Sequence, residues 1–319
     1  MTPPQPVAVA VPALASEAGV DRHSWAIVGA DIAQLVRPKI ALMVLATVAT
    51  GFWLTAGRPA DVRPLLWLLM GTALVAASSS IANQILERHT DRLMPRTADR
   101  PVAAGRLSVA AAWSAAVALL AAGTAISVMA GGWPTTGAAL ATWLLYVAAY
   151  TPLKRVSPLN TAVGAVAGAL PVAIGWLAAD GPARLVAGDP RGAVGAAALG
   201  AVLYLWQFPH FMAIAWLYRR QYAAAGLQML TVVDPSGLRA GGQSLAAALA
   251  MIPAALALAV PSAGIRLFLA AALAAIVYAL AAVRFAIRRD DASARGLLLT
   301  SLGSLLGLLT AAVVLGPPA

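Results

Sequence analysis

Stretches of apolar residues recur along the chain, each close to the length of about 20 residues that an α-helix needs to cross a bilayer. Short polar segments separate them. The pattern predicts an all-α, polytopic membrane protein with nine transmembrane helices, of which the fourth is the shortest. The nine segments are residues 40–57, 64–86, 108–129, 136–151, 159–178, 193–217, 244–262, 265–285 and 296–315.

Lys and Arg are distributed unequally between the two ends of these segments. Of the 22 Lys and Arg, 17 lie before the first segment or near the loops that follow the even-numbered segments, and the tail after the ninth segment has none. Because basic residues are enriched in cytoplasmic loops, we expect the N-terminus in the cytoplasm and the C-terminus on the opposite side of the membrane. If the number of segments were wrong by one, the basic loops would fall on both sides of the membrane. The distribution of charges therefore also favours nine crossings.

The composition fits a membrane protein and excludes several kinds of site. Hydrophobic residues make up 61% of the chain and charged residues 11%, whereas a soluble domain averages about 25% charged residues. The absence of Cys excludes disulfides, thiolate metal sites and cysteine nucleophiles. The net charge of +10 suits loops that face anionic lipid or substrate better than it suits nucleic-acid binding in so apolar a chain.

The N-terminal segment is rich in Pro and Ala and has no basic residue ahead of an apolar stretch, so it does not resemble a secretory signal peptide. We expect residues 1–30 to form a disordered tail. Residues 31–319 would then form a single transmembrane domain.

The second apolar segment runs directly into the polar stretch NQILERHTDRLMPRTADRP, residues 83–101. Asn83, Glu87 and Asp91 are four residues apart and so lie along one side of a helix. Their oxygen atoms suit Mg²⁺, which is typically held by one or two carboxylates together with substrate phosphates and water. Pro95 should end the helix and let RTADRP fold back over the same site. A neighbouring stripe carries guanidinium groups that match phosphate geometry, at Arg88, Arg92, Arg96 and Arg100.

A basic cytoplasmic loop whose charges only pair along the helix is the alternative explanation for residues 83–101. The polar stripe begins inside the apolar segment, where a charge costs about 3 kcal/mol. For that reason we favour a ligand site.

A second polar group lies within LYLWQFPHFMAIAWLYRRQYAAAGLQML, residues 203–230. Gln207 and His210 fall inside the membrane beside Pro209, which interrupts the helix and frees backbone groups. Intramembrane His is rare and usually faces the bundle interior, so a role as ligand or acid–base group is favoured over packing alone. The cytoplasmic end of the same helix carries Arg219, Arg220 and Tyr222.

A third basic loop, in YTPLKRVSPLNTAVGAVAGALP, contains Lys154 and Arg155, a pair that most short cytoplasmic loops carry. Three basic loops and one acidic stripe therefore gather on one face of a bundle rich in Gly and Ala. This combination suits an amphiphile with an anionic head group and a long apolar tail, such as an isoprenoid diphosphate.

Together these three stretches resemble the protoheme IX farnesyltransferase (haem O synthase) branch of the intramembrane aromatic prenyltransferase superfamily. The similarity runs from about Arg37 to the end of the ninth segment and is weakest after residue 240. The first stretch is similar to the Asn/Asp motif of the whole superfamily. The blocks YTPLKR and WQFPHF are specific to the haem branch.

The resemblance implies a nine-helix prenyltransferase bundle with a central cavity open to the cytoplasm and to the bilayer. It implies an Mg²⁺-dependent enzyme that transfers a farnesyl group from farnesyl diphosphate to the 2-vinyl group of haem B, with addition of water, to give haem O. The implied partners are these two substrates and the lipid bilayer, with haem A synthase or the terminal-oxidase assembly machinery as candidates and no nucleic acid. A bacterial plasma (inner) membrane location follows from the family.

Site residues are carried over by position. Asn83, Glu87 and Asp91 match the first metal motif and are expected to bind Mg²⁺, and with Arg92 they form the expected catalytic set. His210 matches a family histidine suited to ligating or orienting haem. The expected substrate-binding residues are Arg88, Arg96, Arg100, Lys154, Arg155, Gln207, His210, Arg219 and Tyr222.

The chain departs from the family pattern at four positions. His89 stands where the first motif usually has Asp, and Glu87 replaces a common Asp. Gln221 stands where the second motif usually has an acidic residue, and Arg220 where an acid or Lys is common. Gln221 still offers a carbonyl oxygen to a metal. These changes keep two alternatives open: a prenyltransferase acting on a quinone precursor or another tetrapyrrole, and a catalytically weakened paralogue that binds haem or lipid.

Overall fold

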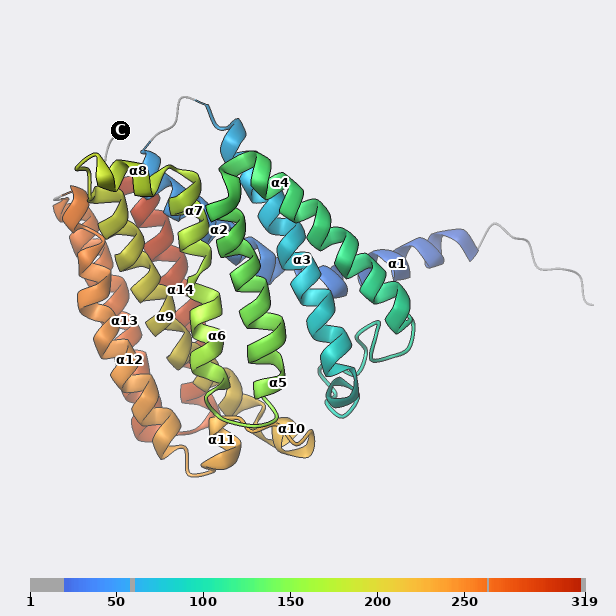
Figure 1. The fold of residues 1–319 in the computed structure, drawn as a ribbon. Coiled ribbons are helices and arrows are strands. Elements are labelled where there is room, and N and C mark those ends of the chain that lie inside the picture. Colours follow the sequence, from blue (N-terminus) through green and yellow to red (C-terminus); the bar gives the residue numbers. More distant parts are fainter. Residues whose placement is uncertain (1–19, 58–60, 263, 317–319) are drawn as a thin grey trace, which may run out of the picture.

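The computed structural model of the protein describes residues 20–57, 61–262 and 264–316, and the regular elements in those ranges are all helices (Figure 1). Eight of these helical segments are long and apolar enough to cross a membrane. The prediction of an all-α membrane protein is thereby confirmed. The eight are α2 (Pro38–Ala56), α3 (Arg63–Asp91), α4 with its continuation (Val109–Leu153), α6 with α7 (Asn160–Ala178), α9 (Arg191–Leu217), α12 with η3 (Leu238–Ser262), α13 (Ile265–Arg288) and α14 (Asp291–Leu315).

Shorter elements connect these helices or divide them. Those outside the eight segments are α1 (Val20–Val36), α8 (Gly181–Val186), α10 (Arg219–Ala224) and α11 (Leu230–Val233). Those within them are α4 itself (Val109–Leu144), the π-helical turn η2 (Leu145–Tyr150), α5 (Thr151–Leu153), α6 (Asn160–Ala169), α7 (Pro171–Ala178), α12 (Leu238–Ala257) and η3 (Val260–Ser262).

The segment Val109–Leu153 has 45 residues, a length of about 68 Å at 1.5 Å per residue, more than twice the thickness of a hydrocarbon core. Gly132 interrupts it with φ 71° and ψ −175°, just before Pro134. Figure 1 shows α4 rising beside α3 and then running back toward α5. The break lies between the third and fourth predicted segments. The number of nine membrane crossings stays a prediction, because it requires that the helix on each side of Gly132 crosses the membrane.

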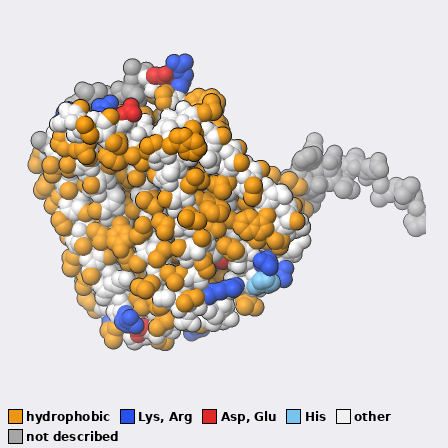
Figure 2. Space-filling model, in the orientation of Figure 1, with side chains coloured by type: hydrophobic (Ala, Val, Ile, Leu, Met, Phe, Trp, Pro, Cys, Tyr) orange, Lys and Arg blue, Asp and Glu red, His pale blue; other side chains and the backbone are white. Residues whose placement is uncertain are grey.

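Close packing of α2 against α7 depends on glycine. A Cβ on Gly175 would lie 2.1 Å from the carbonyl oxygen of Val48, and a Cβ on Gly51 would lie 2.7 Å from that of Val172. Small residues let helix backbones approach where lipid gives no hydrophobic drive for association. Apolar side chains accordingly cover the sides of the molecule, while charged side chains gather toward its two ends (Figure 2).

The N-terminal prediction needs a correction. Helix α1 begins at Val20, so residues 20–30 are helical rather than part of a disordered tail, and residues 1–19 lie outside the described residues. A tertiary contact that the sequence does not reveal involves Asp31, in the second half of α1. Arg106 Nη2 and Nε donate to the Asp31 carboxylate at 2.7 and 3.0 Å and tie α1 to the loop after α3.

Candidate functional site

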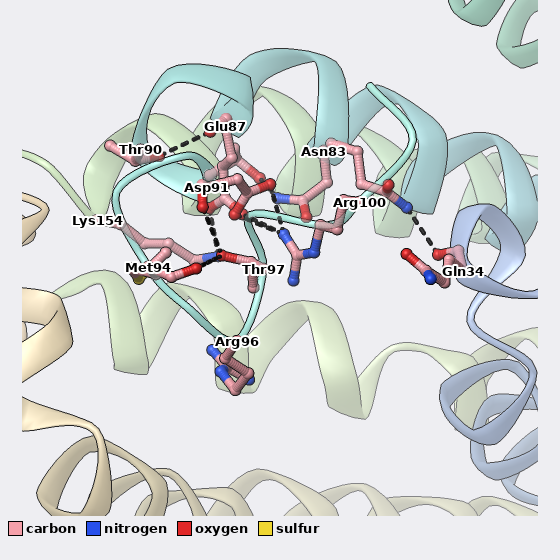
Figure 3. Close-up of polar contacts among 12 residues, drawn as sticks. Gln34, Asn83, Glu87, Thr90, Asp91, Met94, Arg96, Thr97, Arg100 and Lys154 are labelled. Carbon is pink, nitrogen blue, oxygen red and sulfur yellow. Dashed lines mark hydrogen bonds and ion pairs between the residues drawn. The ribbon is translucent and has the colours of Figure 1, made fainter. Parts of the chain in front are cut away.

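The predicted stripe of Asn83, Glu87 and Asp91 lies on the last turns of α3, on the side turned into the bundle (Figure 3). Asn83 and Asp91 are buried, and the Glu87 side chain is 12% exposed. The C-terminus of α3, the short helix α5 and the start of α6 lie at the same end of the molecule (Figure 1). The stripe therefore belongs to a buried polar cluster at this end of the molecule.

Two cations lie against the two carboxylates. Arg100 Nη1 donates to both oxygens of Asp91, at 2.6 and 2.7 Å, and lies 3.8 Å from Glu87 Oε2. Lys154 Nζ donates to Glu87 Oε1 at 2.7 Å and sits 4.3 Å from the centre of the Tyr150 ring. Burial lowers the pKa of Lys154, but the Glu87 carboxylate outweighs it, so the pKa is raised and the ammonium stays charged. Each of the two buried carboxylates is thus paired with a cation.

The loop after α3 folds back as expected, and α3 ends at Asp91, four residues before Pro95, which has no N–H to donate to the Asp91 carbonyl. The Thr97 hydroxyl donates to the Asp91 carbonyl at 3.1 Å, and successive turns replace the helix from there. The Asp91 carbonyl also accepts from the Met94 N–H at 3.2 Å, so two groups of the loop satisfy it beyond the end of the helix. This fold-back brings Arg100 against Asp91, nine residues earlier in the chain.

The four arginines consequently do not form one helical stripe, which corrects that prediction. Arg88 donates to the carbonyl of Ile85 on its own helix, and Arg92 Nε donates to the carbonyl of Ala103 at 2.6 Å. Only Arg100 of the four contacts a carboxylate of the stripe in the part of the chain that the structure describes.

Arg96 points away from the stripe (Figure 3). Its guanidinium lies 4.5 Å from the centre of the Tyr218 ring and donates to the Tyr222 hydroxyl at 3.3 Å. It thereby links the loop after α3 to α10, which also carries Gln221. The Gln221 Oε1 atom is buried and has no hydrogen-bond partner among the described residues.

Gln207 and His210 lie within α9 and are engaged in helix packing. Gln207 Nε2 donates to the carbonyls of Ala165 and Leu203, each at 3.0 Å. His210 stacks on the Trp206 ring, with 4.5 Å between ring centres. Within the described ranges no hydrogen bond or ion pair joins either residue to the acidic stripe.

The ring nitrogens of His210 differ in their bonding. The hydroxyl of Ser301 gives its proton to the carbonyl of Leu298 at 2.6 Å, so its oxygen accepts from His210 Nδ1 at 2.7 Å. A neutral imidazole that donates from Nδ1 carries its lone pair on Nε2. His210 therefore has a nitrogen with the electron pair that an iron ligand needs.

The remaining predicted basic residues make no ion pair with the acidic stripe among the described residues. Arg219 lies over the Trp216 ring at 4.4 Å and pairs with Asp291 at 2.8 Å, which ties α10 to α14. Arg155 and Arg220 are exposed.

Arg37 is a residue of this site that the sequence did not single out. It stands at the break between α1 and α2 in the left-handed conformation, with φ 49°, and its Nη2 atom is buried without a partner among the described residues. Its charge, after burial itself, lowers the pKa of Arg100. Gln84 Nε2 holds the break by donating to the carbonyls of Gln34 and Leu35, at 2.9 and 3.2 Å. The left-handed backbone conformation of this non-glycine residue is what draws attention to Arg37, and only the structure reveals that conformation.

Comparison with known proteins places the chain among membrane prenyltransferases. The UbiA prenyltransferase family matches residues 44–313. A protoheme IX farnesyltransferase of Rhodopirellula baltica is 43% identical over 68% of this chain and 73% of its own length. A protein of the same name from Solibacter usitatus is 37% identical over 85% of this chain and 93% of its own length.

Solved structures show the same fold at low sequence identity. A digeranylgeranylglyceryl phosphate synthase superposes with a TM-score of 0.71 and 15% identity, over 90% of this chain and 97% of its own. A UbiA homologue from Archaeoglobus fulgidus, bound to GPP and Mg²⁺, superposes with a TM-score of 0.63 and 18% identity, over 89% of this chain and all of its own.

Proposed function

The chain belongs to the UbiA prenyltransferase family, and we propose that it transfers a farnesyl group from farnesyl diphosphate to the 2-vinyl group of haem B, with addition of water, to give haem O. The observation that carries this proposal is the match with proteins named protoheme IX farnesyltransferase, which reaches 85% of the chain. A buried acidic stripe beside buried cations supports it, because this arrangement suits a metal-bound diphosphate.

The donor set at the end of α3 fits Mg²⁺. Among the described residues no group of three His, Asp or Glu side chains could hold a metal ion. The protein ligands would therefore be two carboxylates, Glu87 and Asp91, together with the amide oxygen of Asn83. The Asn83 Oδ1 atom is buried and has no hydrogen-bond partner among the described residues, as expected of an oxygen whose role is to bind a cation. When bound, Mg²⁺ would supply positive charge that stabilises the departing diphosphate.

The cations of the site would bind the diphosphate of the substrate. In the reaction, the bond between C1 of the farnesyl group and the diphosphate oxygen breaks, and the electron pair leaves with the diphosphate. We expect Arg100, Lys154 and Arg37 to lie near the oxygens on which that negative charge increases, because fixed charges in a buried site stabilise it most effectively. A new bond joins C1 to the terminal vinyl carbon, and water then adds its oxygen to the neighbouring carbon and releases a proton.

Haem would lie nearer α9, where we assign Gln207 and His210 to haem contacts. The lone pair on His210 Nε2 supports a role in ligating or orienting haem iron. Further predicted substrate contacts are Arg88, Arg96, Arg155, Arg219 and Tyr222, with Gln221 as a candidate metal ligand. We place the protein in a bacterial plasma membrane with its N-terminus in the cytoplasm, where haem A synthase or oxidase assembly factors are candidate partners.

Purified protein in detergent, supplied with farnesyl diphosphate, haem B and Mg²⁺, provides the test. Haem O should form together with released pyrophosphate, as measured by liquid chromatography with mass spectrometry. A parallel reaction offers an aromatic quinone precursor in place of haem B. Farnesylation of that precursor, with no product from haem B, would overturn the proposal.

A further inference from the structure

The turn that precedes Thr151 is π-helical, an uncommon conformation that often marks functional sites. It spans Leu145–Tyr150, and the Thr151 backbone N–H closes it on the carbonyl of Tyr146, five residues earlier. The Thr151 hydroxyl donates to the same carbonyl at 2.8 Å. The wider turn thus directs the Thr151 side chain toward α3, where it meets Asn83.

The hydrogen bonds of Thr151 determine which end of the Asn83 amide faces it. A hydroxyl has one proton to donate, and Thr151 gives that proton to Tyr146. Its oxygen can therefore only accept from Asn83, whose Nδ2 donates to it at 3.0 Å. Thr151 is 4% exposed and Asn83 is 0% exposed, so solvent does not compete for this bond.

The other end of the amide, Oδ1, is buried and has no partner in the described part of the chain. Asn83 lies on the same side of α3 as Glu87 and Asp91 (Figure 3). A reversed amide would set two acceptor oxygens against each other and turn its NH₂ group toward the cations of the site. Both consequences are unfavourable, so the hydrogen bonds around Thr151 favour a single orientation of the Asn83 amide.

We propose that Thr151 is a positioning residue that holds the Asn83 amide with Oδ1 directed to the metal and diphosphate of the substrate. This inference rests on the proposed function, because it assigns to Asn83 Oδ1 the cation that the function requires. Thr151 itself contacts neither metal nor substrate. Partners that orient a metal ligand in this way typically change metal affinity by about 10- to 100-fold when they are removed.

The test compares Thr151→Val, which removes the hydroxyl and keeps the shape, with Thr151→Ser, which keeps the hydroxyl. Binding of Mn²⁺ to purified protein in the presence of inorganic pyrophosphate is measured from the electron paramagnetic resonance signal of free Mn²⁺. We expect Thr151→Val to weaken Mn²⁺ binding about tenfold or more, and Thr151→Ser to bind like the wild type. Thr151→Ala removes the same hydroxyl and provides a second variant with the same expectation.

The Asn83→Asp background separates positioning from folding. A carboxylate presents an oxygen in either orientation, so adding Thr151→Val to Asn83→Asp should change Mn²⁺ affinity less than about twofold. An equal loss in both backgrounds, or a Thr151→Val protein that binds Mn²⁺ like the wild type, would overturn the inference. No haem is needed in this experiment: a wild type that binds Mn²⁺ but makes no haem O contradicts the proposed function and leaves the role of Thr151 standing.

Discussion

Replacing Arg100 by Leu should destabilise the protein strongly, because Arg100 is the direct partner of the most deeply buried carboxylate of the site. The Asp91 side chain is 1% exposed and the Arg100 side chain 16% exposed. Arg100 Nη1 donates to both oxygens of the Asp91 carboxylate, at 2.6 and 2.7 Å. Without the guanidinium, Asp91 would keep a buried charge with no direct counter-ion.

The expected cost follows from that geometry. Removing one partner of a buried ion pair costs about 3–5 kcal/mol, most of which comes from the charge left behind. At about 2–4 °C per kcal/mol for a large domain, the apparent melting temperature should fall by on the order of 10 °C. Added Mg²⁺ should restore more of the melting temperature in Arg100→Leu than in the wild type, because a bound cation replaces the missing charge.

The chain offers a matched control at the N-terminal end of α3, the helix that carries Asp91. Arg63 pairs with Asp61 at 2.9 Å, but these side chains are 81% and 48% exposed, and exposed pairs contribute little. Thermal unfolding of purified protein in detergent, followed by tryptophan fluorescence, should show Arg63→Leu within about 2 °C of the wild type. An Arg100→Leu protein that melts as high as Arg63→Leu would refute the reasoning.

Three further predictions concern packing and the metal. Gly175→Ala should destabilise by about 1–3 kcal/mol through a clash with the α2 backbone at Val48, whereas Gly200→Ala, with no atom within 4 Å of the added Cβ, should be neutral or slightly stabilising in the same thermal assay. Gln221→Glu should lower the Mg²⁺ concentration needed for half-maximal activity, because it puts a carboxylate where a buried amide oxygen has no partner in the described residues. An unchanged dependence of activity on Mg²⁺ concentration would place this residue outside the metal site. Chelation by EDTA should abolish farnesyl transfer, and added Mg²⁺ should restore it; activity that persists after chelation would exclude a metal requirement.

Local periodicity accounts for what the sequence predicted correctly. The spacing of Asn83, Glu87 and Asp91 suffices to place them on one side of α3, since all three lie within one helix. Apolar length likewise identified the spanning helices, and the gap between the third and fourth segments contains Gly132, where α4 breaks. Each of these features depends on residues close together in the chain.

The parts that could not be predicted depend on contacts between distant residues. Arg100 does not belong to a helical stripe, because α3 ends at Asp91 and the loop returns to that residue. The pairing of Lys154 with Glu87 joins residues 67 positions apart. His210 was expected inside the bundle because intramembrane His usually faces its interior, but the sequence could not show that its neighbour is Ser301 on α14.

Haem analysis of living cells tests the central claim most directly. The protein is expressed in a bacterial host that cannot make haem O, membranes are collected, and extracted haems are separated by chromatography and identified by mass. We predict haem O from the wild type and none from Asp91→Ala expressed at the same level. A well-expressed wild type that yields haem B alone, with farnesyl diphosphate present in the cells, would contradict the account.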